Sequence, residues 1–186
     1  MRIALLYPPP WQIPAPALAP PTADGPPRDY QVGDLDGDFC QVPYGLLTLA
    51  VTARRAKHQV KVLNLSAFPW SQVLAVVERL EAELYGMSCY TANRRGVASL
   101  ADAIHVRHPQ AHVTVGGPHA TAMATEMLAH HQAIDSVAVG EGEHTLLELA
   151  ERLSQRADLG GLAGLVYRRH GKIERGPPRS PLRDLD

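Results

Sequence analysis

The sequence predicts an α/β fold of the Rossmann-like, flavodoxin-like type: a five-stranded parallel sheet in the order 2-1-3-4-5, helices on both faces and a C-terminal β-hairpin. Two observations predict it. Short apolar runs alternate with segments whose apolar residues recur at helical spacing, and this strand–helix unit occurs five times in a row. The chain has 186 residues, 45% hydrophobic and 20% charged, which is usual for one globular domain.

The first unit contains the least regular part of the sequence. An apolar run at 2–7 predicts a buried strand, which ends at Pro8–Pro10 because proline has no N–H to continue a sheet. Residues 11–43 show no periodicity and are rich in Pro, Gly and Asp, which predicts a long loop, functional or mobile. A helix then begins at 43–45.

The later units are more regular, and a predicted helix follows each predicted strand. The strands are expected at 60–65, 84–90, 112–115 and 136–139, and the helices at 71–80, 97–108, 122–130 and 146–153. Residues 162–169 and 172–175 flank a glycine turn, which predicts the hairpin. We therefore expect a Rossmann-like domain over 1–155, and the hairpin with a linker over 156–186.

Composition excludes several classes of protein. The 18 Lys+Arg nearly balance the 19 Asp+Glu, so no basic excess indicates nucleic acid or an anionic membrane surface as a partner. No apolar run has transmembrane or signal-peptide length, so the expected compartment is the cytoplasm. Cys40 and Cys89 are too few for a disulfide framework, a four-cysteine zinc site or a three-cysteine iron–sulfur motif.

Ligands of an open parallel sheet bind beyond the carboxyl ends of its strands, which here means the loops at 8–10, 88–93, 116–121 and 140–144. Prolines after the first strand exclude a dinucleotide-binding glycine turn, and no Gly-Lys-Ser/Thr phosphate loop is present. That first loop also lacks the Ser, Thr and Gly of a flavin phosphate site and the acidic residues of a receiver domain.

Each remaining loop permits a ligand-binding and a structural interpretation. The pair Gly116-Gly117 allows either close approach of a large ligand or an ordinary strand-to-helix turn. The carboxylates in 140–143 favour capping of the next helix over acid–base catalysis. The polar residues of 88–93 could contact a ligand or cap the helix that follows them.

Several segments together resemble the cobalamin-binding domain of cobalamin-dependent radical SAM enzymes of the class B methyltransferase type. They are VGGPHAT at 115–121, VGEGEHTL at 139–146, YPP at 7–9, PYGLL at 43–47 and QVKV at 59–62. The resemblance covers 1–155 in order and spacing. The ending at 181–186 is similar to the linker that precedes the radical SAM barrel in such proteins.

The resemblance implies a cobalamin held over the carboxyl edge of the sheet, with its nucleotide tail beside the strands. Residues 88–91 would line the tail pocket, 116–117 would pack on the nucleotide loop, 140–143 would meet the corrin side chains, and 11–43 would cover the corrin or contact a catalytic domain. The cofactor-binding candidates are Pro9, Pro10, Ser88, Cys89, Tyr90, Thr91, Asn93, Gly116, Gly117, Pro118, His119, Gly140, Glu141, Gly142 and Glu143.

Two departures limit what the resemblance implies. The Asp-x-His-x-x-Gly motif that supplies a cobalt ligand in the methionine-synthase type is absent, and His119 lies in a suitable loop but is more typical of a polar loop residue. The Cys-x-x-x-Cys-x-x-Cys motif is also absent, so S-adenosylmethionine and a [4Fe-4S] cluster would belong to a catalytic domain outside this chain.

We therefore expect a module that holds methylcobalamin for a radical SAM enzyme, which would methylate an unactivated carbon. No catalytic residue or metal ligand is assigned within the chain. The alternative is a module of the same fold that binds another nucleotide-like ligand, or only a protein partner, without cobalamin. We also expect Gly117→Val to weaken corrin binding and leave the fold intact.

Overall fold

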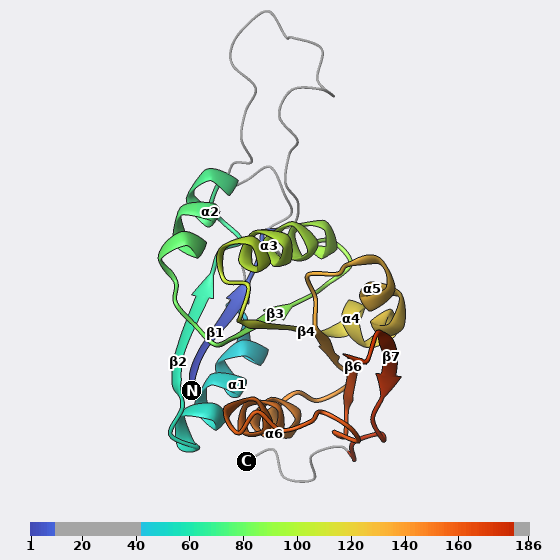
Figure 1. The fold of residues 1–186 in the computed structure, drawn as a ribbon. Coiled ribbons are helices and arrows are strands. Elements are labelled where there is room, and N and C mark those ends of the chain that lie inside the picture. Colours follow the sequence, from blue (N-terminus) through green and yellow to red (C-terminus); the bar gives the residue numbers. More distant parts are fainter. Residues whose placement is uncertain (10–41, 181–186) are drawn as a thin grey trace, which may run out of the picture.

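A computed structural model describes residues 1–9 and 42–180. Its sheet has the order β2-β1-β3-β4-β5-β6-β7 (Figure 1). The strands are β1 Arg2–Tyr7, β2 Gln59–Asn64, β3 Leu84–Ser88, β4 His112–Gly116, β5 Ser136–Ala138, β6 Leu165–Arg169 and β7 Lys172–Arg175. The first five are parallel, which confirms the predicted 2-1-3-4-5 order.

The predicted strand number was wrong, because the sheet has seven strands and not five. The predicted hairpin forms, but β6 pairs antiparallel with β5 and so extends the sheet. Side chains of β6 enter both hydrophobic cores: Val166 lies in one and Tyr167 in the other, each about 2% exposed or less. Burial of these side chains explains why the hairpin covers the short strand β5 and does not project from the domain.

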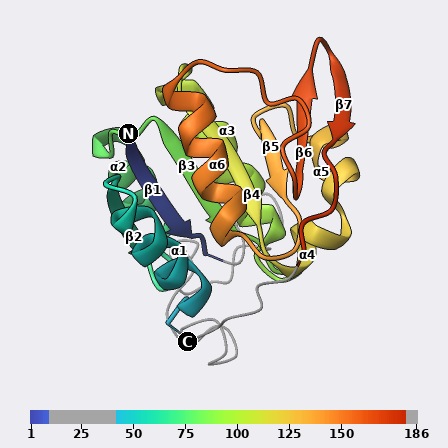
Figure 2. The same ribbon diagram turned by 90° about the horizontal axis from the view of Figure 1, so that it is seen from below.

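Helices cover both faces of the sheet (Figures 1 and 2). They are α1 Tyr44–Arg55, α2 Trp70–Arg79, α3 Arg94–Arg107, α4 Pro118–Ala122, α5 Ala124–His130 and α6 Glu143–Ser154. The helices α1 and α6 share one core with β1 and β6, whereas α2, α3 and α5 share the other core with β3 and β4. None of the described helices is long and apolar enough to cross a membrane.

The helix predicted at 122–130 forms as α5, and a separate short helix, α4, precedes it. The helix α4 begins at Pro118, whose fixed φ suits the first helical position, and Met123 separates the two with φ −118° and ψ 27°. Pro10, Cys40, nearly all of the predicted loop 11–43, and the linker residues 181–186 lie outside the described residues.

Candidate functional site

The two faces of β3, β4 and β5 carry side chains of very different size. Successive residues of a strand point to opposite faces. Toward α2–α5 the strands direct Tyr85, Met87, Val113, Val115 and Val137, all buried in one core. Toward α1 and α6 they direct Gly86, Ser88, Thr114, Gly116, Ser136 and Ala138. The small residues leave space under α1 and α6 that the large ones do not leave on the other face.

That space is a cavity of about 910 Å³. Its inner end lies two residues inside the strand ends, where Leu5 pairs with Gly86 and Gly86 pairs with Thr114. Its walls are Leu46 and Leu49 of α1 and Leu146 and Leu149 of α6. The cavity therefore runs between two helices and opens at the carboxyl edge of the sheet, where the loops after β3, β4 and β5 surround it.

An aromatic pair stands at the mouth of the cavity. The rings of Tyr7 and Tyr90 meet edge to face, with centroids 6.1 Å apart. Tyr7 is 7% exposed and Tyr90 is 44% exposed, so the pair joins the core to solvent. Burial, with a smaller contribution from Tyr90, raises the pKa of Tyr7 above its usual value, so its hydroxyl stays protonated.

Ten of the fifteen predicted site residues line this cavity: Ser88, Tyr90, Thr91, Gly116, Gly117, Pro118, Gly140, Glu141, Gly142 and Glu143. Pro10 lies outside the described residues. The sequence prediction missed Leu5, Tyr7, Val42, Pro43, Tyr44, Gly45, Leu46, Leu49, Gly86, Met87, Ala92, Thr114, Ala138, Thr145, Leu146 and Leu149. Alternation of large and small residues along β3 and β4 was the signal that could have found the sheet residues among them.

Four predicted residues lie apart from the cavity lining. Cys89 is fully buried in the core of the opposite face, and burial raises its pKa to about 12, so it is a neutral thiol. The Asn93 side chain accepts a hydrogen bond from Tyr90 N (2.7 Å) and donates one to Ser88 O (3.1 Å), which fixes the loop after β3. Pro9 packs its carbonyl against Gly96 of α3.

His119 is the fourth predicted site residue that lies apart from the cavity lining. Its Nδ1 lies 3.1 Å from Thr91 Oγ1, and the residue lines a separate hollow beside α3 and α5. This position gives no support to the idea that His119 approaches a cobalt in the main cavity. In the described part of the chain, no three His, Cys, Asp or Glu side chains come together as a metal site.

The adjacent glycines Gly116 and Gly117, at the end of β4, have different roles. Gly117 has φ +104°, and a Cβ there would lie 2.8 Å from Cys89 O and 3.0 Å from Cys89 N. Gly117 is therefore required by the backbone of the neighbouring loop, and the expectation that Gly117→Val spares the fold does not agree with this geometry. At Gly116 a Cβ would make an ordinary 3.7 Å contact with Ala138 Cβ.

Glu143 connects the two helices that wall the cavity. It is the first residue of α6, and its Oε1 accepts a hydrogen bond from Thr48 of α1 at 3.1 Å. A carboxylate at this end also suits the positive end of the helix dipole. This placement agrees with the structural interpretation of the acidic loop residues.

Comparison with known protein families identifies the type of domain that contains this cavity. A model of the B12 binding domain matches residues 36–150. The chain belongs to the B12-binding domain family. The match includes α1, the strands β2–β5 and most of α6, and therefore most of the residues that line the cavity.

Relatives of this B12-binding domain include methyltransferases of greater length. It is 30% identical over 146 residues to the uncharacterized methyltransferase PH0819 of Pyrococcus horikoshii, which covers 77% of this chain and 32% of that protein. It is 33% identical over 104 residues to the cobalamin-dependent radical SAM methyltransferase TokK of Streptomyces tokunonensis, covering 55% of this chain and 15% of that protein. The chain thus spans about a third or less of these relatives.

The fold matches a solved structure along nearly the whole chain. The radical S-adenosylmethionine methyltransferase TsrM of Kitasatospora setae, with cobalamin and a [4Fe-4S] cluster bound, superposes with a TM-score of 0.66 at 20% identity. The superposition covers 99% of this chain and 30% of the TsrM chain. It shows that the α/β architecture of this chain, including the hairpin, occurs in a solved structure.

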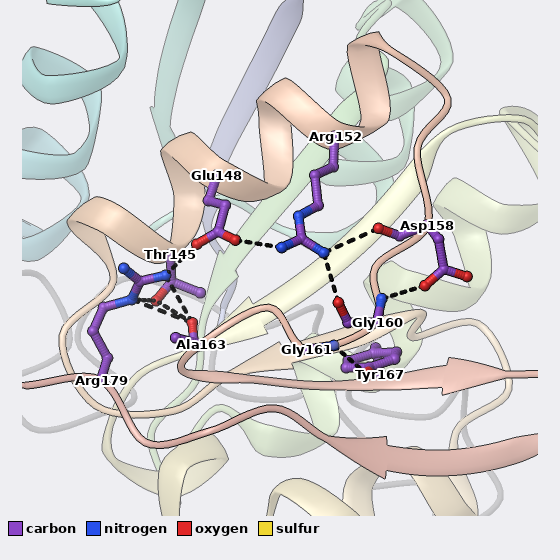
Figure 3. A network of polar contacts seen from close by, with 9 residues as sticks. All are labelled: Thr145, Glu148, Arg152, Asp158, Gly160, Gly161, Ala163, Tyr167 and Arg179. Carbon is purple, nitrogen blue, oxygen red and sulfur yellow. Dashed lines mark hydrogen bonds and ion pairs between the residues drawn. The ribbon is translucent and has the colours of Figure 1, made fainter.

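A polar network fastens the hairpin end of the B12-binding domain to α6 (Figure 3). Glu148 accepts hydrogen bonds from Arg152 (2.6 Å) and Arg179 (2.7 Å). Arg179 also donates to Thr145 Oγ1 (3.0 Å), and Thr145 lines the cavity. Partial burial acts to raise the pKa of Glu148, but the two arginines outweigh it and lower the pKa below its usual value. The network holds α6 at a fixed distance from the hairpin and so maintains one cavity wall.

Proposed function

We propose that this B12-binding domain holds cobalamin over the carboxyl edge of its sheet, with the nucleotide tail in the cavity between α1 and α6. The observation that carries the proposal is the cavity of about 910 Å³, which opens at that edge. Small residues on the sheet side, Gly86, Thr114 and Gly116, let a narrow group enter beside the strands. Apolar walls with few polar groups are typical of cofactor sites.

Each part of the site has its own proposed role. Leu49 and Leu149 would pack on the tail, because both face the cavity from opposite helices. The backbone at 116–118 would follow the nucleotide loop, and the loop at 140–143 with Tyr90 would contact the corrin. Bound cobalamin would supply cobalt-centred methyl transfer, and the domain would bind and orient it.

The proposal for the whole protein is a radical SAM methyltransferase that acts on an unactivated carbon and uses methylcobalamin. S-adenosylmethionine and a [4Fe-4S] cluster would bind a catalytic domain outside this chain, in the cytoplasm. The greater length of the relatives supports this division. So does the cysteine content, because the chain has only Cys40 and Cys89 and the latter is a buried thiol. We place the cobalamin-binding unit at 1–180, since the hairpin is part of its sheet.

The direct test is retention of cobalamin. Purified protein is incubated with hydroxocobalamin and desalted, and its visible spectrum is recorded. We expect corrin absorbance to remain with the protein at close to one equivalent. The full-length protein is tested in parallel, because a catalytic domain would cover the corrin. Absence of corrin absorbance in both would contradict the proposal and favour a different nucleotide-like ligand.

A matched pair of variants tests the position of the site. Gly116→Val adds a branched side chain to the cavity lining, so we expect cobalamin affinity to fall at least about tenfold. Ala129→Val adds the same kind of bulk to an exposed residue of α5, on the opposite face. It should leave affinity unchanged. Equal affinities of the two variants would place the cofactor elsewhere.

A further inference from the structure

A buried chain of hydrogen bonds ends at the inner end of the cavity. His112 Nε2 lies 2.8 Å from Ser136 Oγ, and Ser136 Oγ lies 3.0 Å from Thr114 Oγ1. Ser136 is fully buried and Thr114 is 5% exposed. Thr114 and Ser136 pair across β4 and β5, so the strands hold them opposite each other. Only Thr114 of the three lines the cavity.

The chain of hydrogen bonds has a direction that the ring of His112 sets. Burial lowers the pKa of His112, against a smaller opposing effect of Asp135, so the imidazole is neutral and has one N–H. When Nε2 carries that hydrogen, it donates to Ser136, and Ser136 donates to Thr114. The hydroxyl hydrogen of Thr114 then has no acceptor among the described residues. It is available to a group in the cavity.

The residues around Thr114 indicate the kind of ligand group to which its hydroxyl would donate. Leu5 and Gly86 lie beside it in the same row of the sheet, and Leu149 lies on the helix side. These neighbours offer no competing polar side chain, so a ligand here must be largely apolar and must have one hydrogen-bond acceptor. A heteroaromatic ring with an unprotonated ring nitrogen has this chemistry.

We infer that the Thr114 hydroxyl donates a hydrogen bond to the ring nitrogen of the heteroaromatic base at the end of the cobalamin tail, with Ser136 and His112 as positioning residues. The inference rests on the proposed function, because it needs the tail in this cavity. It also requires the base to leave the cobalt, since the ring nitrogen cannot bind cobalt and accept this hydrogen bond at once. The side chain that recognises the base would therefore lie in the interior of β4, two residues before the strand ends.

The test compares two corrinoids with two variants. Cobinamide lacks the nucleotide tail, so it cannot reach Thr114. For Thr114→Val, we expect the Kd of hydroxocobalamin to rise about three- to tenfold, the range for one neutral hydrogen bond, while the Kd of cobinamide is unchanged. Thr114→Ser keeps the hydroxyl and should bind hydroxocobalamin within about twofold of the wild type.

Ser136→Ala tests the positioning role. It removes the donor that orients Thr114, so it should also weaken hydroxocobalamin but not cobinamide. Combined with Thr114→Val it should add little, because both changes remove the same interaction. A full additional loss in the double variant would overturn the role of Ser136, since it would show two independent effects.

Other outcomes separate this inference from the proposed function. Equal weakening of both corrinoids by Thr114→Val, or no weakening of either, would overturn the inference while cobalamin binding stands. Failure of the wild type to bind either corrinoid would reject the proposed function itself. If Thr114→Val does not fold, Ser136→Ala is the deciding variant. It should raise the Kd of hydroxocobalamin about three- to tenfold and leave that of cobinamide unchanged, and an unchanged Kd of hydroxocobalamin would overturn the inference.

Discussion

The two faces of β3 and β4 have different roles: one face packs a hydrophobic core and the other lines a cavity. Facing α2–α5, Tyr85, Met87 and Val115 fill the space between sheet and helices. Facing α1 and α6, Gly86 and Gly116 leave a cavity of about 910 Å³. A strand that is buried on both faces can therefore stabilise the fold with every second residue and accommodate a ligand with the residues between them.

The largest expected effect comes from equal leucine truncations on the two faces. Leu100 of α3 is fully buried in the filled core, and Leu149 of α6 is 1% exposed but borders the cavity. Without ligand, Leu100→Ala should lower the free energy of unfolding by about 4 kcal/mol and Leu149→Ala by about 2 kcal/mol. The loss for Leu149→Ala should be smaller, because Leu149 already lacks packing partners on its cavity side. Urea unfolding of the protein without cobalamin measures both.

Saturating cobalamin should change only one of these two penalties. A ligand that binds the folded state raises its stability, and Leu149 would then contact the ligand. The penalty for Leu149→Ala should therefore grow when cobalamin is present, whereas the penalty for Leu100→Ala should stay the same. Identical penalties for Leu149→Ala with and without cobalamin would contradict the assignment of this face to the cofactor.

The difference between the faces also explains which parts of the fold the sequence predicts. The strand at 2–7 was confirmed because an apolar run and the following prolines are both local signals. The strand predicted at 84–90 ends at Ser88, because Asn93 binds the backbone of Tyr90 and Ser88. Pairing of the hairpin with β5 is a tertiary contact, and no periodicity within 162–175 indicates it.

The candidate site was predictable at its edge but not in its interior. Topology alone places the loops at 116–118 and 140–143 at the carboxyl edge, and all of these residues line the cavity. Local sequence does not reveal that Cys89 points into the opposite core or that Asn93 is used by its own loop. Leu49 and Leu146 have the pattern of core residues, because only the small residues of the sheet that share their cavity make them cavity walls.

A smaller effect should distinguish the two adjacent glycines. Gly117→Ala places a Cβ 2.8 Å from Cys89 O at a positive φ, so we expect a loss of about 1–3 kcal/mol in the free energy of unfolding. Gly116→Ala meets only Ala138 Cβ at 3.7 Å, so stability should change by about 0.5 kcal/mol or less. Thermal unfolding measures the loss of stability in each variant. Equal losses would show that the backbone conformation requires both glycines.

The smallest expected effect concerns Glu148 of α6, which supports a cavity wall without lining the cavity itself. The pKa of Glu148 is lowered in the folded protein, so its ion pairs stabilise the fold fully above the usual pKa near 4.5 and lose that contribution as the pH falls through the lower folded value. Glu148→Gln should lower stability at neutral pH by about 1 kcal/mol or less, because the group is a third exposed, and the difference from wild type should vanish in acid. The effect stays small because Arg152 and Arg179 keep their backbone acceptors Gly160 O and Ala163 O. Glu151→Gln is the control, since among the described residues the carboxylate of Glu151, on the same helix, accepts a hydrogen bond only from the neutral amide of Gln155, the residue that follows α6. A pH-independent difference between Glu148→Gln and wild type would show that the carboxylate charge does not hold this wall of the cavity.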